Sequence, residues 1–453
     1  MPMISAIGAR EILDSRGFPT IEVDVRLSDG AFGRAAAPAG SSVGTREAHE
    51  LRDGDPARYS GLGVRKAVAA VERIIAPALV ETRVDDLATI DRHLIALDGT
   101  VDKSRLGANT LLAVSLAMTY ALAGSRERPL HEYLSTTART ELPVPMFNVL
   151  NGGTHASNTI DLEDFMIAPV GAPSFAEAVR MGAETYQALR ALLKRAGMTT
   201  AVGDEGGFAP DVGADAEAIE LLLRAIEQAG LKPGADIVLA LDAAATSLYD
   251  GGVYVFRKSM RHRRGTEQMI HRYKEWTQHY PIWSIEDGLA DADTEGWRAL
   301  CATLGNRIQL VGDDLFATRA TLIRDAITRG IANAALIKLN QVGTVSETLE
   351  AVEEARRGSY GIVISHRSAE TGDDFIADLA VAVGAGQIKT GAPARGERVA
   401  KYNQLLRIEQ ALGARARYAG RRFMQQGGFH REAVGEPAVL AADVDRRIDA
   451  VGA

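Results

Sequence analysis

Six short apolar segments between residues 237 and 389 each end in a residue that can carry charge. These end residues are Asp242, Glu286, Asp313, Lys338, His366 and Lys389. After the first interval, they recur at about the length of a strand, a loop and a helix. If the segments are neighbouring strands of one sheet, their end residues meet at one edge, and two lysines, a histidine and three carboxylates form a candidate active site.

The composition of these segments indicates how the strands are arranged. They read as almost continuous Ile, Val and Leu, which is typical of parallel strands buried on both faces between crossover helices. Consecutive strand–helix units with polar residues at the carboxyl ends of the strands describe a closed βα barrel, in which active sites gather at that rim. We therefore expect an α/β fold with the site at one mouth of a barrel.

The three carboxylates predict a metal site. Asp242, Glu286 and Asp313 would repel one another strongly at one barrel mouth unless a cation neutralised them. A set of oxygen ligands without His or Cys suits Mg²⁺.

The lysines and the segment after the fifth strand predict proton transfer and anion binding. Beside a divalent cation and a second lysine, the pKa of Lys338 is expected to fall, which suits a general base that removes a proton next to a carboxylate. The run from His366 to Ser368 would clamp a phosphate or carboxylate, and Lys389 would add a second counter-charge.

Length and charge limit the class of protein. With 453 residues the chain should hold two domains, and a formal charge of −8 argues against bulk nucleic-acid binding. Its single cysteine, Cys301, excludes an intramolecular disulfide and suits the cytoplasm. The N-terminus lacks the apolar region of a signal peptide, and the longest apolar run, Leu111–Gly124, is too short and polar for a membrane span and predicts a buried helix.

The first part of the chain differs in pattern from the rest. Residues 3–30 alternate between apolar and polar side chains, and Asp29-Gly30 turns into a partner strand at 31–37. Helical patterns follow over residues 62–135. We expect an N-terminal α+β domain over 1–135, a barrel over 143–425 and a C-terminal extension over 426–453.

Two loops each leave alternatives open. The glycine- and hydroxyl-rich segment Pro38–Asp55 is either a plain surface loop or an active-site lid. The basic segment Phe256–Gly265 is either a solvated loop or a docking patch for a phosphate- or nucleotide-bearing partner.

Two further stretches carry ionisable residues before the barrel repeat. In VPMFNVLNGGTHASNTIDLEDFMIAP, two strand-like runs flank a Gly-Gly loop with His155, and Glu163 and Asp164 lie on or beside the second run. In VGDEGGFAP, Glu205 lies between glycines, where an acid is by itself usually only a turn residue.

Taken together, these motifs resemble the enolase family. The stretches that carry the resemblance are PAGSSVGTREAHELRDGD, VLNGGTHASN, VGDEGGFAP, SIEDGL, LVGDDLF, LIKLNQVGT, ISHRSAET and QIKTGAPARGERVAKYNQLLRIE. The resemblance covers nearly all of residues 3–423. It implies an N-terminal α+β cap, a modified eightfold barrel, two Mg²⁺ ions, a small phosphorylated carboxylate as substrate, and a homodimer or larger homo-oligomer.

The resemblance also implies roles for particular residues. Asp242, Glu286 and Asp313 would hold the first Mg²⁺ and Ser42 the second. Lys338 would take the C2 proton of 2-phosphoglycerate, and Glu205 would assist departure of the C3 hydroxyl. The other implied catalytic residues are Asp164 and His366, and the implied substrate contacts are Ser41, His155, Glu163, Arg367, Ser368 and Lys389.

Departures from the family pattern gather around this expected site. Glu163-Asp164 replaces Gln-Glu, and Ala39-Gly40-Ser41-Ser42-Val43-Gly44 replaces the usual lid motif Ser-Gly-Ala-Ser-Thr-Gly, which removes the hydroxyls at positions 39 and 43. Phe18 replaces Asn, and Ala369 replaces Gly.

The departures leave three functions to consider. The first is the enolase reaction, which forms phosphoenolpyruvate. The second keeps the enolate chemistry but acts on a second, phosphonate or nucleotide-linked substrate, as in carboxyphosphonoenolpyruvate synthase of phosphonate biosynthesis, with the shorter Asp164 leaving room for a bulkier group. The third is a non-enzymatic enolase-like scaffold.

Overall fold

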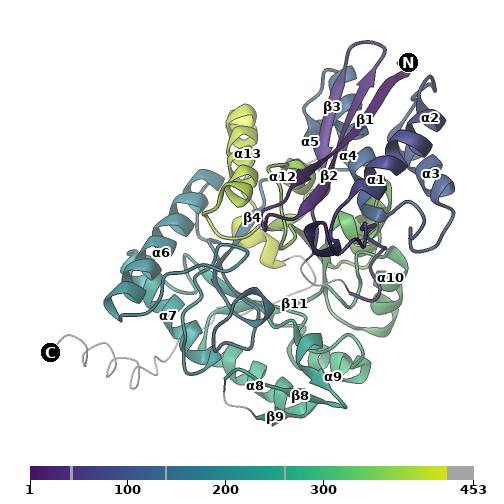
Figure 1. The fold of residues 1–453 in the computed structure, drawn as a ribbon. Coiled ribbons are helices and arrows are strands. Elements are labelled where there is room, and N and C mark those ends of the chain that lie inside the picture. The colour runs from purple at the N-terminus through teal and green to yellow at the C-terminus, as the bar shows by residue number, and fades with distance from the viewer. Residues whose placement is uncertain (41–43, 138–139, 260–261, 426–453) are drawn as a thin grey trace.

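A small antiparallel sheet with helices precedes a large closed barrel in this computed structural model, which describes residues 1–40, 44–137, 140–259 and 262–425 (Figure 1). Ser41, Ser42 and Val43 of the expected lid, and the expected C-terminal extension, lie outside the described residues. The predicted fold class, an eight-stranded βα barrel preceded by an α+β cap, is confirmed.

The N-terminal sheet is built by alternating side chains. Its strands β1 (Ile4–Leu13), β2 (Pro19–Leu27) and β3 (Phe32–Ala36) pair antiparallel in that order. The alternating stretch is thus two strands rather than one, because the chain turns between Leu13 and Pro19. The apolar positions of β2 are buried, as their period of two predicts.

One helix forms the centre of this part of the chain. α4 (Ala108–Ser125) packs against β2, β3 and α3, and its apolar residues are buried on nearly all sides. It is long and apolar enough to cross a membrane, but 83% of it is buried inside the protein, so the predicted buried helix is confirmed. The neighbouring helical elements are α1 (Arg65–Ala70), η2 (Val71–Ile75), α2 (Ala76–Leu79), α3 (Leu87–Asp98) and α5 (Leu130–Tyr133).

The barrel closes in the order β10-β11-β12-β13-β14-β4-β5-β6. Its strands are β4 (Val144–Asn151), β5 (Asp164–Ala168), β6 (Val238–Asp242), β10 (Ile282–Glu286), β11 (Gln309–Gly312), β12 (Ala334–Ile337), β13 (Gly361–Ser365) and β14 (Gly386–Lys389). The helices that cover them are α6 (Phe175–Arg195), α7 (Asp215–Gln228), α8 (Thr266–His279), α9 (Thr294–Leu304), α10 (Ala320–Arg329), α11 (Val345–Arg357), α12 (Phe375–Ala382) and α13 (Gly396–Leu412). A small sheet of β7 (Tyr249–Asp250), β8 (Val253–Val255) and β9 (Arg263–Arg264) lies between β6 and α8 in the chain and accounts for the long first interval.

Strand β5 departs from the parallel rule. It runs antiparallel to both of its neighbours, β4 and β6. Its first residue, Asp164, therefore lies at the same mouth as the last residues of the parallel strands, and it pairs directly with Asp242, which in turn pairs with Glu286. The reversal places a further carboxylate at the level of the expected metal ligands.

The opposite end of the barrel is closed by the last described segment of the chain. Phe423, in η7 (Gly420–Gln425), packs edge-on against Trp283 with ring centroids 5.9 Å apart. Both belong to an apolar cluster formed with residues at the start of the parallel strands, including Val144 and Val238. This plug separates the barrel interior from solvent on the side away from the candidate site.

We expect Phe423→Ala to lower the free energy of unfolding by about 3–5 kcal/mol, because it removes a buried ring and leaves a cavity. Urea unfolding followed by tryptophan fluorescence measures this loss. Val101→Ala, at a side chain that is 88% exposed, is the control and should change stability by less than about 0.5 kcal/mol. Equal stability of the two variants would show that the plug does not close the barrel.

Candidate active site

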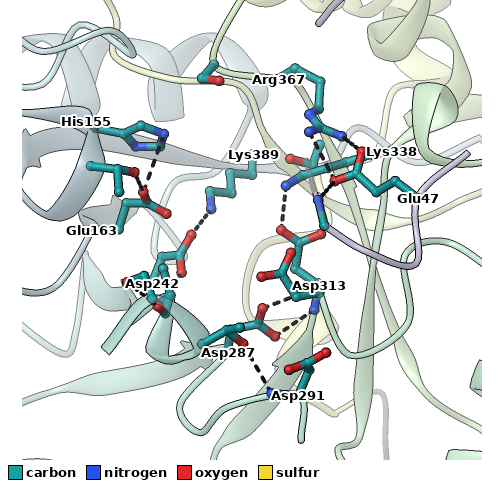
Figure 2. Close-up of a pocket in the computed structure, with 18 of the residues that line it drawn as sticks. Glu47, His155, Glu163, Asp242, Asp287, Asp291, Asp313, Lys338, Arg367 and Lys389 are labelled. Carbon is teal, nitrogen blue, oxygen red and sulfur yellow. Dashed lines mark hydrogen bonds and ion pairs between the residues drawn. The ribbon is translucent and has the colours of Figure 1, made fainter. Parts of the chain in front are cut away.

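A cavity of about 360 Å³ opens at the barrel mouth where the strand-end residues meet (Figure 2). Ten of the residues expected from the sequence line it: His155, Glu163, Glu205, Asp242, Asp313, Lys338, His366, Arg367, Ser368 and Lys389. Glu286 and Asp164 lie beneath the lining, 1% and 0% exposed. The structure therefore brings together all the expected site residues that it describes.

Two lysines balance the three carboxylates of the expected metal site. The Lys389 ammonium donates to Asp242 Oδ2 at 2.6 Å and to Glu286 Oε1 at 2.9 Å. Lys338 donates to Asp313 Oδ2 at 2.5 Å. Figure 2 shows the Lys389–Asp242 pair and the Lys338–Asp313 pair among the residues that line the cavity. These contacts satisfy the rule that buried charges need partners of opposite charge.

The pKa directions follow from these pairs. Burial, and then the neighbouring Asp242, raises the pKa of Glu286 well above its usual range. Burial lowers the pKa of Lys338, but the Asp313 carboxylate raises it, and the net direction is upward. Among the protein's own groups the ion pair with Asp313 stabilises the ammonium, and the fall expected beside a divalent cation stays a prediction.

The donor set fits a hard divalent cation. The second oxygens of Glu286 and Asp164 are buried and accept no hydrogen bond from the described residues. A buried oxygen without a donor is costly, and a cation shared by carboxylates would relieve both that cost and their mutual repulsion. Asp242, Glu286 and Asp313 could therefore hold Mg²⁺.

Two acidic residues next to this set were missed in the sequence. Both oxygens of Asp287 accept backbone N–H groups, from Asp313 and Asp314, each at 2.9 Å, so Asp287 fixes the loop that carries Asp313. Burial and Asp313 raise the pKa of Asp314, which lines the cavity, to about 7. Both residues directly follow predicted strand-end acids, which is the signal that could have found them.

A second cluster surrounds His155. Its Nδ1 lies 3.1 Å from Asp164 Oδ1, and its Nε2 lies 3.7 Å from Glu163 and 3.8 Å from Glu205. Burial lowers the pKa of His155, but Asp164, Glu163 and Glu205 raise it well above its ordinary value. The three carboxylates therefore stabilise the protonated form of the imidazole.

Glu205 lies between two histidines. Burial by itself raises the pKa of Glu205. His366 and His155 lower this pKa by a larger amount, so the net pKa lies well below its ordinary value. Asn148 also donates to Glu205 Oε2 at 3.0 Å. This glutamate, which its sequence context left as an ordinary turn residue, is a buried carboxylate at the centre of the site.

The hydrogen bonds of His366 fix its tautomer. Arg398 Nη1 lies 2.7 Å from His366 Nδ1, and since arginine is always protonated, Nδ1 must be the acceptor. The proton of the neutral ring is then on Nε2, which lies 3.0 Å from Glu205 Oε2. Burial lowers the pKa of His366, which favours this neutral form.

The described part of the expected lid reaches the cavity. Glu47 binds Arg367 through both oxygens, at 2.7 and 3.2 Å, and both side chains are 5% exposed. The backbones of Ala39 and Ala369 pair at 2.9 and 3.0 Å. The segment is thus more than a plain surface loop, although its movement as a lid stays a prediction. Glu47 was another residue that the sequence did not single out.

Asp164 does not have the position that the bulkier-substrate hypothesis requires. Its Oδ1 accepts from Asn151 at 2.7 Å and faces His155, and its Oδ2 is 3.8 Å from Lys389. Glu163, not Asp164, lines the cavity. The cavity lining therefore does not support the idea that a shorter Asp164 leaves room for a larger group.

The chain is similar to known proteins along almost its whole length. The family model described as "Enolase, N-terminal domain" matches residues 4–134, and the one described as "Enolase, C-terminal TIM barrel domain" matches residues 139–427. A curated relative named Enolase, from Mycobacterium leprae (strain TN), is 56% identical over 420 residues, which cover 93% of this chain and 97% of the relative.

We expect Mg²⁺ to bind more weakly as the pH falls. Because the pKa of Glu286 is raised, this carboxyl takes up a proton at higher pH than an ordinary glutamate, and a cation that binds there must displace that proton. Binding should therefore release protons and lose affinity toward acid. Isothermal titration calorimetry with Mg²⁺, in buffers of different ionisation enthalpy at about pH 8 and about pH 6, measures both effects.

The matched variants for this titration are Glu286→Gln and Glu295→Gln. The first should weaken Mg²⁺ binding by at least about tenfold, whereas Glu295, exposed on α9, should be neutral. Affinity that is independent of pH and unchanged in Glu286→Gln would rule out this carboxylate as a ligand.

Proposed function

The chain belongs to the enolase family, and we propose that it catalyses the Mg²⁺-dependent, reversible dehydration of 2-phosphoglycerate to phosphoenolpyruvate. It is an enzyme of the lyase class. The observation that carries the proposal is the division of the cavity into two sides. Figure 2 shows Lys338 and Arg367 on one side and His155 and Glu163 on the other. A dehydration that removes a proton at one carbon and hydroxide at the next needs such a division.

The metal site supports the first half of this reaction. Asp242, Glu286 and Asp313 would hold one Mg²⁺ and Ser42 the second. Bound Mg²⁺ supplies positive charge that stabilises an enolate formed from the substrate carboxylate.

Lys338 is placed to take the C2 proton. As long as Asp313 is paired with the ammonium, the pKa of Lys338 is raised and the lysine is a poor base. When Asp313 instead neutralises a cation, this raising effect is withdrawn, while burial and the nearby Arg367 and Lys389 continue to lower the pKa. The pairing of Asp313 thus accounts for both states of Lys338. The lysine is held as an ammonium while it is paired with Asp313, and it becomes a better base when Asp313 pairs with a cation instead.

The other side of the cavity supports departure of the hydroxyl. Because the pKa of Glu205 is low and that of His155 is high, the available proton resides on His155. We propose that the His155–Glu205 pair delivers this proton to the leaving hydroxide. Arg367 and Ser368 would bind the phosphate, and Lys389 would supply a counter-charge to the substrate.

The alternatives receive less support. The 56% identity to a protein named Enolase favours the dehydration over a reaction with a second, phosphonate or nucleotide-linked substrate. Membership of an enzyme family likewise does not favour the non-enzymatic scaffold. A cytoplasmic location, a homo-oligomer and the division at residues 135 and 143 stay predictions.

We expect Lys338→Met to lower turnover by about 10²–10⁴-fold, since it removes the proposed base. Absorbance at 240 nm, which follows phosphoenolpyruvate formed from 2-phosphoglycerate with Mg²⁺, measures the rate. Lys274→Met, at an exposed position on α8, is the matched control and should be as active as the wild type. Wild-type turnover far below about 10 s⁻¹ would contradict the proposed function.

A second prediction concerns the departure at residues 163–164. The double variant Glu163→Gln, Asp164→Glu restores the usual family pair and should raise turnover by up to about tenfold, because catalytic groups are sensitive to displacements of about 1 Å. The same absorbance assay compares it with the wild type. Unchanged or lower turnover would show that Glu163-Asp164 is already adapted to the reaction.

A further inference from the structure

One lysine of the basic segment binds the loop that carries His155. The Lys258 ammonium donates to the backbone carbonyl oxygens of Gly153 and Ala156, at 2.7 Å in the case of Ala156. Gly153 begins the short turn η3 (Gly153–His155), and Ala156 directly follows it, so the two carbonyl groups lie on either side of His155 in the chain. The side chain is partly buried rather than free in solvent, so the expectation of a solvated loop is wrong at this position.

Residues 258–259 form a second set of hydrogen bonds with the loop that carries His155. Asp161, which is 3% exposed, accepts the backbone N–H groups of Lys258 at 2.9 Å and of Ser259 at 2.8 Å, and also the Ser259 hydroxyl. Asp161 lies between His155 and Asp164 in the sequence, so the two sets of bonds join both halves of the loop to residues 258–259. We call Lys258 with Asp161 the loop clamp.

The base of the clamp is itself held firmly. Phe256, two residues before Lys258, is fully buried and lies parallel to the His262 ring, with centroids 4.8 Å apart. The Arg272 guanidinium also lies over the Phe256 ring, 5.0 Å from the ring centroid. The clamp thus connects the loop to the helix α8 side of the barrel wall.

The turn that carries His155 has little room to find another position. Gly153 has φ +48°, and a Cβ there would lie 2.9 Å from Glu163 Cα, so the loop rests directly on the start of β5. A single 3₁₀ turn leaves carbonyl groups without donors of its own. An ammonium group, with three donors, can satisfy two such carbonyls at once.

We propose that Lys258 is a positioning residue that holds His155 against Glu205 and Asp164 for the reaction. This role rests on the proposed function, since it assigns the clamp to the side of the cavity where hydroxide leaves. Lys258 itself does not touch the substrate site: it is absent from the cavity lining and acts through the carbonyl groups on either side of His155.

The test compares four variants of the clamp and its surroundings. Lys258→Met keeps the length of the side chain but removes its donors, and Lys258→Arg restores a cation with donors. Arg257→Met is the matched control, because Arg257 is exposed and directly precedes Lys258, which carries the clamp, whereas among the described residues Arg257 itself forms a surface pair with Asp250 at 3.6 Å. Asp161→Asn weakens the clamp from its other end and serves if Lys258→Met does not fold.

Two readouts separate this role from the proposed function. The first is hydrogen exchange of the peptide covering residues 150–162, followed by mass spectrometry, which needs no activity. The second is the split between kcat and KM in the 240 nm assay. We expect Lys258→Met to exchange faster in this peptide and to lose about 10–100-fold in kcat with little change in KM, because a group used in the transition state is displaced. Lys258→Arg should recover most of the loss, and Arg257→Met should match the wild type.

Other outcomes overturn the proposal. Unchanged exchange in both Lys258→Met and Asp161→Asn would show that the clamp does not hold the loop. Faster exchange with unchanged kcat, or a rise in KM alone, would show that the loop is held but that His155 is not positioned by it for the reaction. If the wild type has no dehydratase activity, the proposed function fails, and the exchange data alone then decide whether the clamp holds the loop.

Discussion

Burial of many charges at one barrel mouth is the constraint on which the rest of this structure depends. Asp242, Glu286 and Asp313 are each less than 10% exposed, and such a group of carboxylates is tolerated only with cations close by. In the protein alone, Lys389 and Lys338 provide this charge at hydrogen-bond distance. In the proposed mechanism, Lys338 is a base that pairs with Asp313 as a counter-ion until that carboxylate binds Mg²⁺ instead.

The second cluster has the same logic with a different partner. Three carboxylates around His155 raise its pKa, and the two histidines beside Glu205 lower the pKa of that carboxyl. Arg398 keeps His366 in the tautomer whose proton faces Glu205. Backbone contacts from outside the site, including those of Lys258, hold the loop that makes this cluster possible. The site is therefore a pair of coupled charge networks, separated by the cavity and linked through Lys389.

Two irregular features of the fold bring these charge networks together. Strand β5 runs against its neighbours, and only that reversal places Asp164 beside Asp242 rather than at the far end of the barrel. The glycine turn at Gly153 lets the His155 loop lie directly on the start of the same strand. Both departures from a regular barrel bring additional carboxylates and His155 to the mouth.

The sequence alone determined the barrel and its preceding α+β part, because continuous apolar runs and alternating residues report burial on two faces or on one. It also determined that the six strand-end residues from Asp242 to Lys389 gather at the mouth, since residues that end parallel strands must meet at one rim. It could not determine the direction of β5, the role of Asp287 beneath Asp313, or the attachment of Lys258 to the His155 loop. Nor could it determine the ion pair with Asp313 that raises the pKa of Lys338 among the protein's own groups. These depend on contacts between residues far apart in the chain and on the balance of burial against neighbouring charge, and only the tertiary structure decides that balance.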